Sequence, residues 1–211
     1  GDRISPGDPL VPAVRGVGGT VLRFVDDGPE LKSLWEREFI PCGIAQGSGI
    51  THTDHIAQTM AYEEMLSASL FYSTLFEVER MPMLDVVDPD GLVRSQAIIS
   101  DGLRITLNGA EARRTLARRF IDDTFGASVQ HIALASNDIF VTAEKLAERG
   151  FPFLGIGANY YAALAARFDL KPDFVDRLRR LNIMYDEDGM GSFFQFYSTC
   201  LLYTSPSPRD S

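Results

Sequence analysis

The chain has 211 residues, of which 45% are hydrophobic and 23% charged, as expected of a globular protein with a core. Its formal net charge of −9 argues against nucleic-acid binding, which needs a basic surface, and its two cysteines, Cys42 and Cys200, exclude a disulfide framework or a cysteine-rich zinc site. No apolar run approaches the ~20 residues of a membrane span, so we expect a cytoplasmic protein that binds neither nucleic acid nor a membrane.

The first half of the chain predicts a β-α-β-β-β unit. A strand over residues 21–25 precedes it, and the unit opens at residues 54–58 with the alternating pattern of a half-buried strand. An amphipathic helix over residues 64–75 follows. Turn sequences rich in Asp and Gly then separate three strand-like runs, at residues 78–86, 91–99 and 103–108.

The second half repeats this order. Residues 130–134 (Gln-His-Ile-Ala-Leu) match residues 54–58 (Asp-His-Ile-Ala-Gln), and a helix over residues 139–149 ends at Gly150. An insertion at residues 160–181 predicts two short helices divided by Pro172. Two strands complete the unit, at residues 183–185 and 191–198. The repeat predicts two similar units that pack about a pseudo-twofold axis.

The last residues differ in character from the rest. Residues 201–211 (LLYTSPSPRDS) are rich in Ser and Pro and have no hydrophobic period, which is typical of a linker or a disordered tail. They also resemble translated adapter sequence, so we expect a non-native tail over residues 200–211. The protein would then be truncated within or just after its last strand.

All three histidines lie in the strands that open the two repeats. Alternation places His55 on the face of its strand that corresponds to the face of His131, and it places His52 on the opposite face, where a structural role is expected. Two imidazoles that face one pocket are what a divalent-metal site needs. Separately, each of them could be a core histidine with satisfied hydrogen bonds, but their equivalence in the repeat favours metal binding.

The repeat resembles the vicinal-oxygen-chelate superfamily and, within it, the catalytic half of 4-hydroxyphenylpyruvate dioxygenases. The resemblance implies an α+β fold in which paired βαβββ units form an open, metal-holding cup over residues 50–199. It also implies that residues 1–49 are the tail of a preceding module and a linker. The matching motifs lie at residues 53–56, 107–108, 129–134, 159–161 and 194–196.

The resemblance also implies the site. His55 and His131 correspond to the histidine ligands of a 2-His-1-carboxylate iron(II) site, and Ser95, Asn108 and Gln195 correspond to catalytic polar residues near the substrate. The third ligand, a Glu on a following strand, is expected to be missing from this chain. Asp54 is not expected to replace it, because alternation points Asp54 away from the face of His55.

A second resemblance is closer, and it concerns the C-terminal module of bacterial 3-dehydroshikimate dehydratases. In those enzymes a TIM barrel, absent here, converts 3-dehydroshikimate to protocatechuate. Residues 112–120 contain four Arg and no Gln where the dioxygenases carry a substrate-binding Gln, which disfavours homogentisate formation. A genuine dioxygenase and a non-catalytic binding or assembly domain remain the alternatives. The resemblance implies a small aromatic or keto-acid substrate and leaves a homo-oligomeric parent open.

Overall fold

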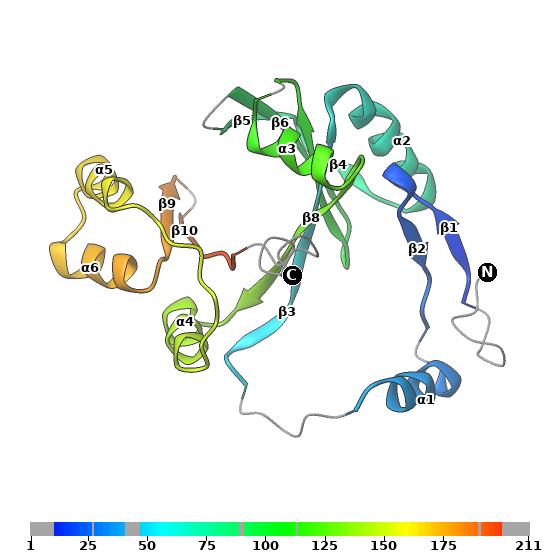
Figure 1. The fold of residues 1–211 in the computed structure, drawn as a ribbon, viewed down its shortest axis with the longest axis horizontal. Helices are drawn as coiled ribbons and strands as arrows, with labels where there is room; N and C mark the ends of the chain where they lie inside the picture. Colours follow the sequence, from blue (N-terminus) through cyan, green and yellow to red (C-terminus); the bar gives the residue numbers. More distant parts are fainter. Residues whose placement is uncertain are drawn as a thin grey trace, which may run out of the picture. The chain divides into compact units, whose positions relative to one another are not determined.

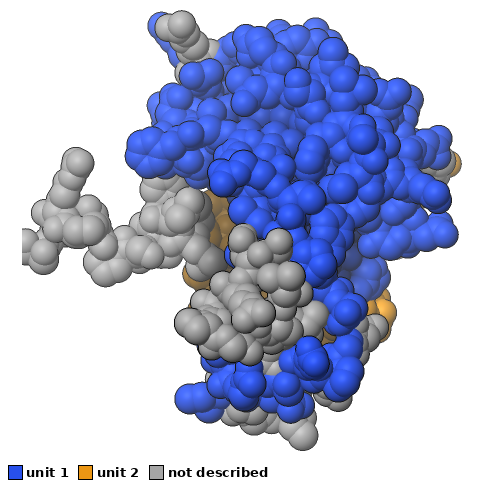
Figure 2. Space-filling view, turned by 90° about the vertical axis from the view of Figure 1, so that its right-hand side faces the viewer, with its two compact units in different colours: residues 1–45, 52–135 blue, residues 46–51, 136–211 orange. Residues whose placement is uncertain are grey.

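The computed structural model describes residues 11–26, 28–40, 47–88, 91–112, 114–189 and 191–199 (Figure 1). The chain forms two compact units, which Figure 2 colours separately: unit 1 contains residues 1–45 and 52–135, and unit 2 contains residues 46–51 and 136–211. No helix in these described ranges is long and apolar enough to cross a membrane. Cys42 and the expected tail at residues 200–211 lie outside the described residues.

Unit 1 is built around a six-stranded sheet with the strand order β4-β6-β7-β3-β8, in which β5 also pairs with β6. β3 (Ile50–Ala61) and β7 (Arg104–Ala110), the first and last strands of the predicted βαβββ unit, are parallel neighbours. The remaining strands are β4 (Glu79–Arg80), β5 (Leu84–Asp88), β6 (Gly91–Ile99) and β8 (Ser128–Ser136).

One face of this sheet forms the core of unit 1. On β7 buried residues alternate with more exposed ones, and Ile105 and Leu107 point into the core together with Met60 of β3. Helix α2 (Met65–Leu75), which continues the 3-10 turn η2 (Tyr62–Glu64), covers this face with Ala68 and Tyr72. The predicted helix over residues 64–75 is therefore confirmed.

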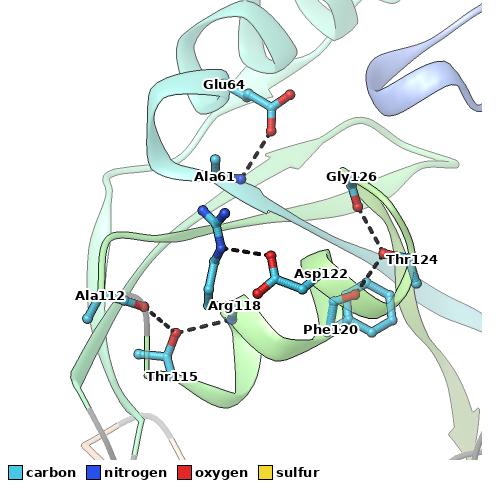
Figure 3. Close-up of polar contacts among 9 residues, drawn as sticks. All are labelled: Ala61, Glu64, Ala112, Thr115, Arg118, Phe120, Asp122, Thr124 and Gly126. Carbon is cyan, nitrogen blue, oxygen red and sulfur yellow. Dashed lines mark hydrogen bonds and ion pairs between the residues drawn. The ribbon is translucent and has the colours of Figure 1, made fainter.

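The opposite face of the sheet is partly covered by helix α3 (Leu116–Asp123). Its buried residues Ala117 and Ile121 cluster with Val93 of β6 and Ala110 of β7, which are cross-strand partners. Figure 3 shows how the helix begins: the Thr115 hydroxyl accepts a hydrogen bond of 3.1 Å from the Arg118 backbone N–H. The sequence pattern does not predict this helix.

The remaining elements of unit 1 precede the sheet. β1 (Ala13–Arg15) and β2 (Val21–Arg23) form a hairpin joined by the 3-10 turn η1 (Val17–Gly19), and α1 (Pro29–Glu38) follows. Val17 and Leu22 of this region pack against the core under α2. The strand predicted over residues 21–25 is thus present but shorter.

Unit 2 contains three helices and a hairpin among its described residues. They are α4 (Ile139–Glu148), α5 (Ala158–Phe168), α6 (Pro172–Arg180), β9 (Met184–Asp188) and β10 (Gly191–Gln195). Asp138 caps α4 by accepting hydrogen bonds from two backbone N–H groups, and Pro172 occupies the first turn of α6, as its position in the sequence predicted. Leu164, Leu178 and Tyr185 belong to the core that these elements enclose.

Two predicted strands differ from the structure. Residues 78–86 form two short strands, β4 and β5, because Pro82 has no N–H to donate to the sheet at the point between them. The last strand ends at Gln195, and Ser198 pairs separately with Phe153. A hydrogen bond of 2.8 Å from the Leu154 N–H to the Tyr197 carbonyl supports this second pairing.

Candidate metal centre

The two histidines that open the repeats lie side by side. β3 and β8 are neighbours in the sheet, and the ring centroids of His55 and His131 are 5.5 Å apart with planes at 78°. Both rings are half-buried. The predicted proximity of these two side chains is confirmed, although they lie far apart in the sequence.

A carboxylate contacts the His55 ring. Asp54 Oδ2 lies 2.7 Å from His55 Nδ1, and Arg104 Nη1 lies 3.3 Å from the same carboxylate oxygen. The hydrogen bond with His55 lowers the pKa of Asp54, burial opposes this shift, and the Arg104 charge adds to it. An ionised Asp54 can only accept, so a neutral His55 ring carries its proton on Nδ1 and its lone pair on Nε2.

This contact corrects one expectation. Asp54 does not turn wholly away from His55, although adjacent side chains of a strand normally point to opposite faces. The β3–β7 pairing begins only at Ile56 opposite Ile105, so the Asp54 side chain has no laterally paired residue on β7 and can turn toward its neighbour. Its carboxylate therefore contacts the ring at Nδ1.

The His131 ring has an equivalent contact with the residue before it. His131 Nδ1 lies 2.6 Å from Gln130 Oε1, and an amide oxygen accepts, so this ring also carries its proton on Nδ1. Burial lowers the pKa of His131, and the charge of His55 lowers it further. Both effects favour the neutral imidazole, which is the form that binds a metal.

The spacing of the two rings is compatible with a single divalent ion. An ion about 2.1 Å from a ring nitrogen lies about 3.3 Å from that ring's centroid, so two imidazoles on one ion have centroids less than about 6.6 Å apart. The observed 5.5 Å is within this limit. No group of three or more His, Cys, Asp or Glu side chains able to hold a metal occurs among the described residues.

Ser95 and Asn108 share the sheet face of His55, which we call the histidine face. Asn108 of β7 pairs with Thr59 of β3 on one side and with Ser95 of β6 on the other. Paired residues project from the same face, and His55 lies four residues before Thr59, so alternation places it on that face about 13 Å along the strand. The next pair, Val93 and Ala110, lies under α3.

Gln195 belongs to unit 2 and is described within that unit. It pairs with Met184 in the β9–β10 hairpin, and its Oε1 accepts a hydrogen bond of 3.2 Å from the Tyr197 hydroxyl. Together with Tyr160 and Arg167 it lines a cavity of about 280 Å³. The structure thus brings four of the five predicted site residues onto one sheet and places Gln195 at a cavity of the other unit.

The sequence assigned no role at this centre to Gln130 or Arg104, and it considered Asp54 only as a metal ligand. Asp54 and Gln130 each precede a histidine, and each can accept a hydrogen bond, so the repeat itself carried a signal that could have identified them. Arg104 had no such signal, because its contact with Asp54 depends on the pairing of β3 with β7. His52 is exposed, and its charge is a minor cause of the lowered pKa of Asp54.

Comparisons with curated proteins identify two groups of relatives. The 3-dehydroshikimate dehydratase of Pseudomonas aeruginosa is 35% identical over 191 residues, which cover 89% of this chain and 30% of the relative. The Pseudomonas putida protein of the same name is 34% identical over 92% of this chain and 31% of its own. The 4-hydroxyphenylpyruvate dioxygenase of Pseudomonas aeruginosa is 27% identical over 88% of this chain and 54% of the relative.

Solved structures give the same grouping. A protein described as a xylose isomerase-like TIM barrel/4-hydroxyphenylpyruvate dioxygenase fusion matches 92% of this chain with a TM-score of 0.67 and 34% identity, and 31% of its own chain is covered. A mutant of 4-hydroxymandelate synthase from Streptomyces coelicolor matches 95% of this chain, with 57% of its own chain covered and a TM-score of 0.72, and at 22% identity it supports the fold alone. No protein-family model matches the chain.

The chain spans about 30% of the length of the dehydratases and about half the length of the dioxygenases that it matches. Both groups match nearly all of it, and the two solved structures match its fold over 92% and 95% of its length. The predicted resemblance is therefore confirmed: the chain is homologous to the 4-hydroxyphenylpyruvate dioxygenase-like part of 3-dehydroshikimate dehydratases and has the vicinal-oxygen-chelate type of fold.

Proposed function

We propose that this chain is the metal-binding, dioxygenase-like module of a 3-dehydroshikimate dehydratase, with His55 and His131 as ligands of one divalent ion. One observation carries the proposal: equivalent histidines of two repeats lie with their rings 5.5 Å apart, each with Nδ1 held by a side-chain acceptor. Two neutral imidazoles whose lone pairs are on Nε2 are a suitable pair of donors for a divalent transition metal.

Iron(II) is the ion we assign to the site, because the resemblance implies a 2-His-1-carboxylate centre. Such an ion supplies open coordination positions and the redox chemistry of dioxygen. The protein contributes two neutral nitrogen ligands, and we assign the carboxylate ligand to no described residue. His55 and His131 bind the ion, and Asp54 and Gln130 contact Nδ1 of their respective rings.

The substrate class we propose is a small aromatic or 2-keto acid bound on the histidine face. Ser95 and Asn108 offer a hydroxyl and an amide there for its polar groups, and α3 covers the sheet one residue pair beyond them. Gln195 is proposed as a third polar contact. The dehydration of 3-dehydroshikimate to protocatechuate and water we assign to the TIM-barrel part of the parent, in line with the fusion protein described above.

A genuine 4-hydroxyphenylpyruvate dioxygenase is the second candidate, and its support is the match to enzymes of that name over about half of their length. The two candidates differ in one measurement, made on the full-length parent protein with all three ligands of the site present. With iron(II), dioxygen and 4-hydroxyphenylpyruvate, a dioxygenase releases homogentisate and carbon dioxide. Our proposal expects no homogentisate above the metal-free background.

Cobalt(II) titration of the purified chain tests the metal site directly. We expect one ion per chain, and we expect His55→Ala and His131→Ala each to weaken binding strongly because each leaves a single imidazole. His52→Ala is the matched control, since His52 is exposed on the same strand and binding should be unchanged. If His52→Ala abolishes binding and His55→Ala does not, the ligand assignment is wrong.

A further inference from the structure

Each histidine of the centre is hydrogen-bonded through Nδ1 to the residue before it, but the two partners differ in chemistry. His55 has a carboxylate, Asp54, at 2.7 Å, and His131 has an amide, Gln130, at 2.6 Å. The carboxylate is itself held by Arg104, whose Nη1 lies 3.3 and 3.4 Å from its two oxygens. The result is a chain of contacts, Arg104–Asp54–His55, that crosses from β7 to β3.

We propose that Asp54, held by Arg104, is a positioning residue that fixes the His55 ring in its Nδ1–H form and directs Nε2 to the metal. The claim that Nε2 is directed to a metal rests on the proposed function. The claim about the tautomer does not, because the tautomer is a property of the metal-free protein. A ligating histidine that donates its other N–H to a carboxylate is oriented and made more basic by it.

The geometry supports a specific role for the pair. Arg104 directly precedes Ile105, which pairs with Ile56 of β3, so Arg104 lies at the start of the β3–β7 pairing, next to the segment that carries Asp54 and His55. From there the guanidinium reaches the Asp54 carboxylate, which would otherwise be free to rotate into solvent, since its side chain is 36% exposed. Arg104 contacts the Asp54 carboxylate, and we expect it to act on His55 through that contact.

The tautomer can be read without a metal. The chain has only three histidines, so long-range ¹H–¹⁵N spectra of the metal-free protein at pH 8 resolve three imidazoles, and His52→Ala and His131→Ala assign them. In wild type we expect His55 as the Nδ1–H form. In Asp54→Ala we expect a shift toward the Nε2–H form, and in Asp54→Asn a partial shift, because an amide oxygen can still accept.

Asp85 and Arg94 provide the matched controls. They form a separate ion pair of 3.0 Å between β5 and β6, of the same residue types as Asp54 and Arg104. Asp85→Ala and Arg94→Met should leave the His55 spectrum unchanged, whereas Arg104→Met should move it in the same direction as Asp54→Ala, but less. Near-ultraviolet circular dichroism tests whether each variant is folded. If Asp54→Ala does not fold, Asp54→Asn takes its place in the comparison.

Cobalt(II) affinity gives the second reading. Removal of an outer-shell partner typically weakens metal binding about 10- to 100-fold, so Asp54→Ala should do so and Asp85→Ala should not. If His55 is already in the Nε2–H form in wild type, or is unmoved by Asp54→Ala, the inference is wrong whatever the metal does. If the tautomer shifts as expected but wild type binds no cobalt(II), the positioning role stands and the proposed metal function fails.

Discussion

The Tyr72 hydroxyl donates a hydrogen bond of 2.8 Å to Oε1 of Gln58 in the core of unit 1. Tyr161 in the core of unit 2 is equally buried, with 1% of its surface exposed like Tyr72, but its hydroxyl has no hydrogen-bond partner among the described residues. The two tyrosines are therefore equally buried, but only the Tyr72 hydroxyl has a hydrogen-bond partner among the described residues.

Replacement of each tyrosine by Phe should give opposite results. Tyr72→Phe leaves the buried Gln58 Oε1 without its donor and should lower the free energy of unfolding of unit 1 by about 1–2 kcal/mol. Tyr161→Phe removes a buried hydroxyl that has no partner, so the stability of unit 2 should be unchanged or slightly higher. Urea unfolding at pH 7 measures both, and a larger loss in Tyr161→Phe than in Tyr72→Phe would contradict the contrast.

Tyr161 also predicts the response of the protein to alkali. Burial, with a smaller contribution from Tyr160, raises the pKa of Tyr161 to about 12, above the 10.0 of an unperturbed tyrosine. The folded state therefore keeps this proton while the unfolded state loses it. The stability associated with it is complete below pH 10 and is lost as the pH rises from 10 toward 12.

Ultraviolet absorbance of tyrosinate checks this expectation. A titration from pH 8 to 13 should show one phenol that ionises last, and Tyr161→Phe should lack that step. Tyr161→Phe should also lose less stability than wild type between pH 9.5 and 11. Equal alkaline sensitivity of the two proteins would show that Tyr161 is not the late-ionising group.

The sequence predicted the repeat, the paired histidines and the bounds of β6, because each depends on a local pattern. The alternation of side chains around His55 and His131 predicts strands from neighbouring residues alone. The Asp-Gly sequences predict the ends of strands in the same way. The predicted β6 matches the observed Gly91–Ile99 at both ends.

The features that were missed depend on contacts between distant segments. Helix α3 is short, and only two of its residues, Ala117 and Ile121, are buried. They are buried because they pack against Val93 and Ala110 of the sheet, which are distant in the sequence. Arg104 could not be linked to Asp54 before the pairing of β3 with β7 was known. The roles of His55, His131, Ser95, Asn108 and Gln195 stay predictions.

Two adjacent glycines test how the β1–β2 hairpin packs against the rest of unit 1. Gly18 (φ 62°) and Gly19 (φ 80°) both have left-handed backbones, so Ala at either position costs about 1 kcal/mol for conformation. A Cβ on Gly18 would lie 2.0 Å from the Ala127 carbonyl oxygen, whereas one on Gly19 would meet nothing within 4 Å.

Gly18→Ala should therefore destabilise unit 1 by about 1–3 kcal/mol more than Gly19→Ala, or detach the hairpin from it, because backbone atoms cannot yield as a side chain can. Urea unfolding compares the two variants, and hydrogen exchange of β1 and β2 reports detachment. Equal stability and equal exchange in both variants would mean that the hairpin does not pack against Ala127.

The His131 imidazole should make the stability of the folded protein sensitive to acid. Burial and the charge of His55 lower the pKa of His131 below the ordinary value of 6.5, so the folded protein keeps it neutral at pH values where the unfolded chain binds a proton. The unfolded state binds more protons in this range, and stability must therefore fall as the pH drops through 6.5 toward the folded pKa. It should be independent of this group above pH 7.5.

Two measurements on the metal-free protein check it. The C2 proton of His131 should titrate with a midpoint below 6.5 in ¹H NMR. Between pH 7.5 and 5.5 the wild type should lose more stability in urea unfolding than His131→Gln, which has no proton to bind, while all other titrating groups are common to both proteins. A midpoint at or above 6.5, or equal losses in the two proteins, would mean that burial does not hold His131 in the neutral form that the proposed metal site requires.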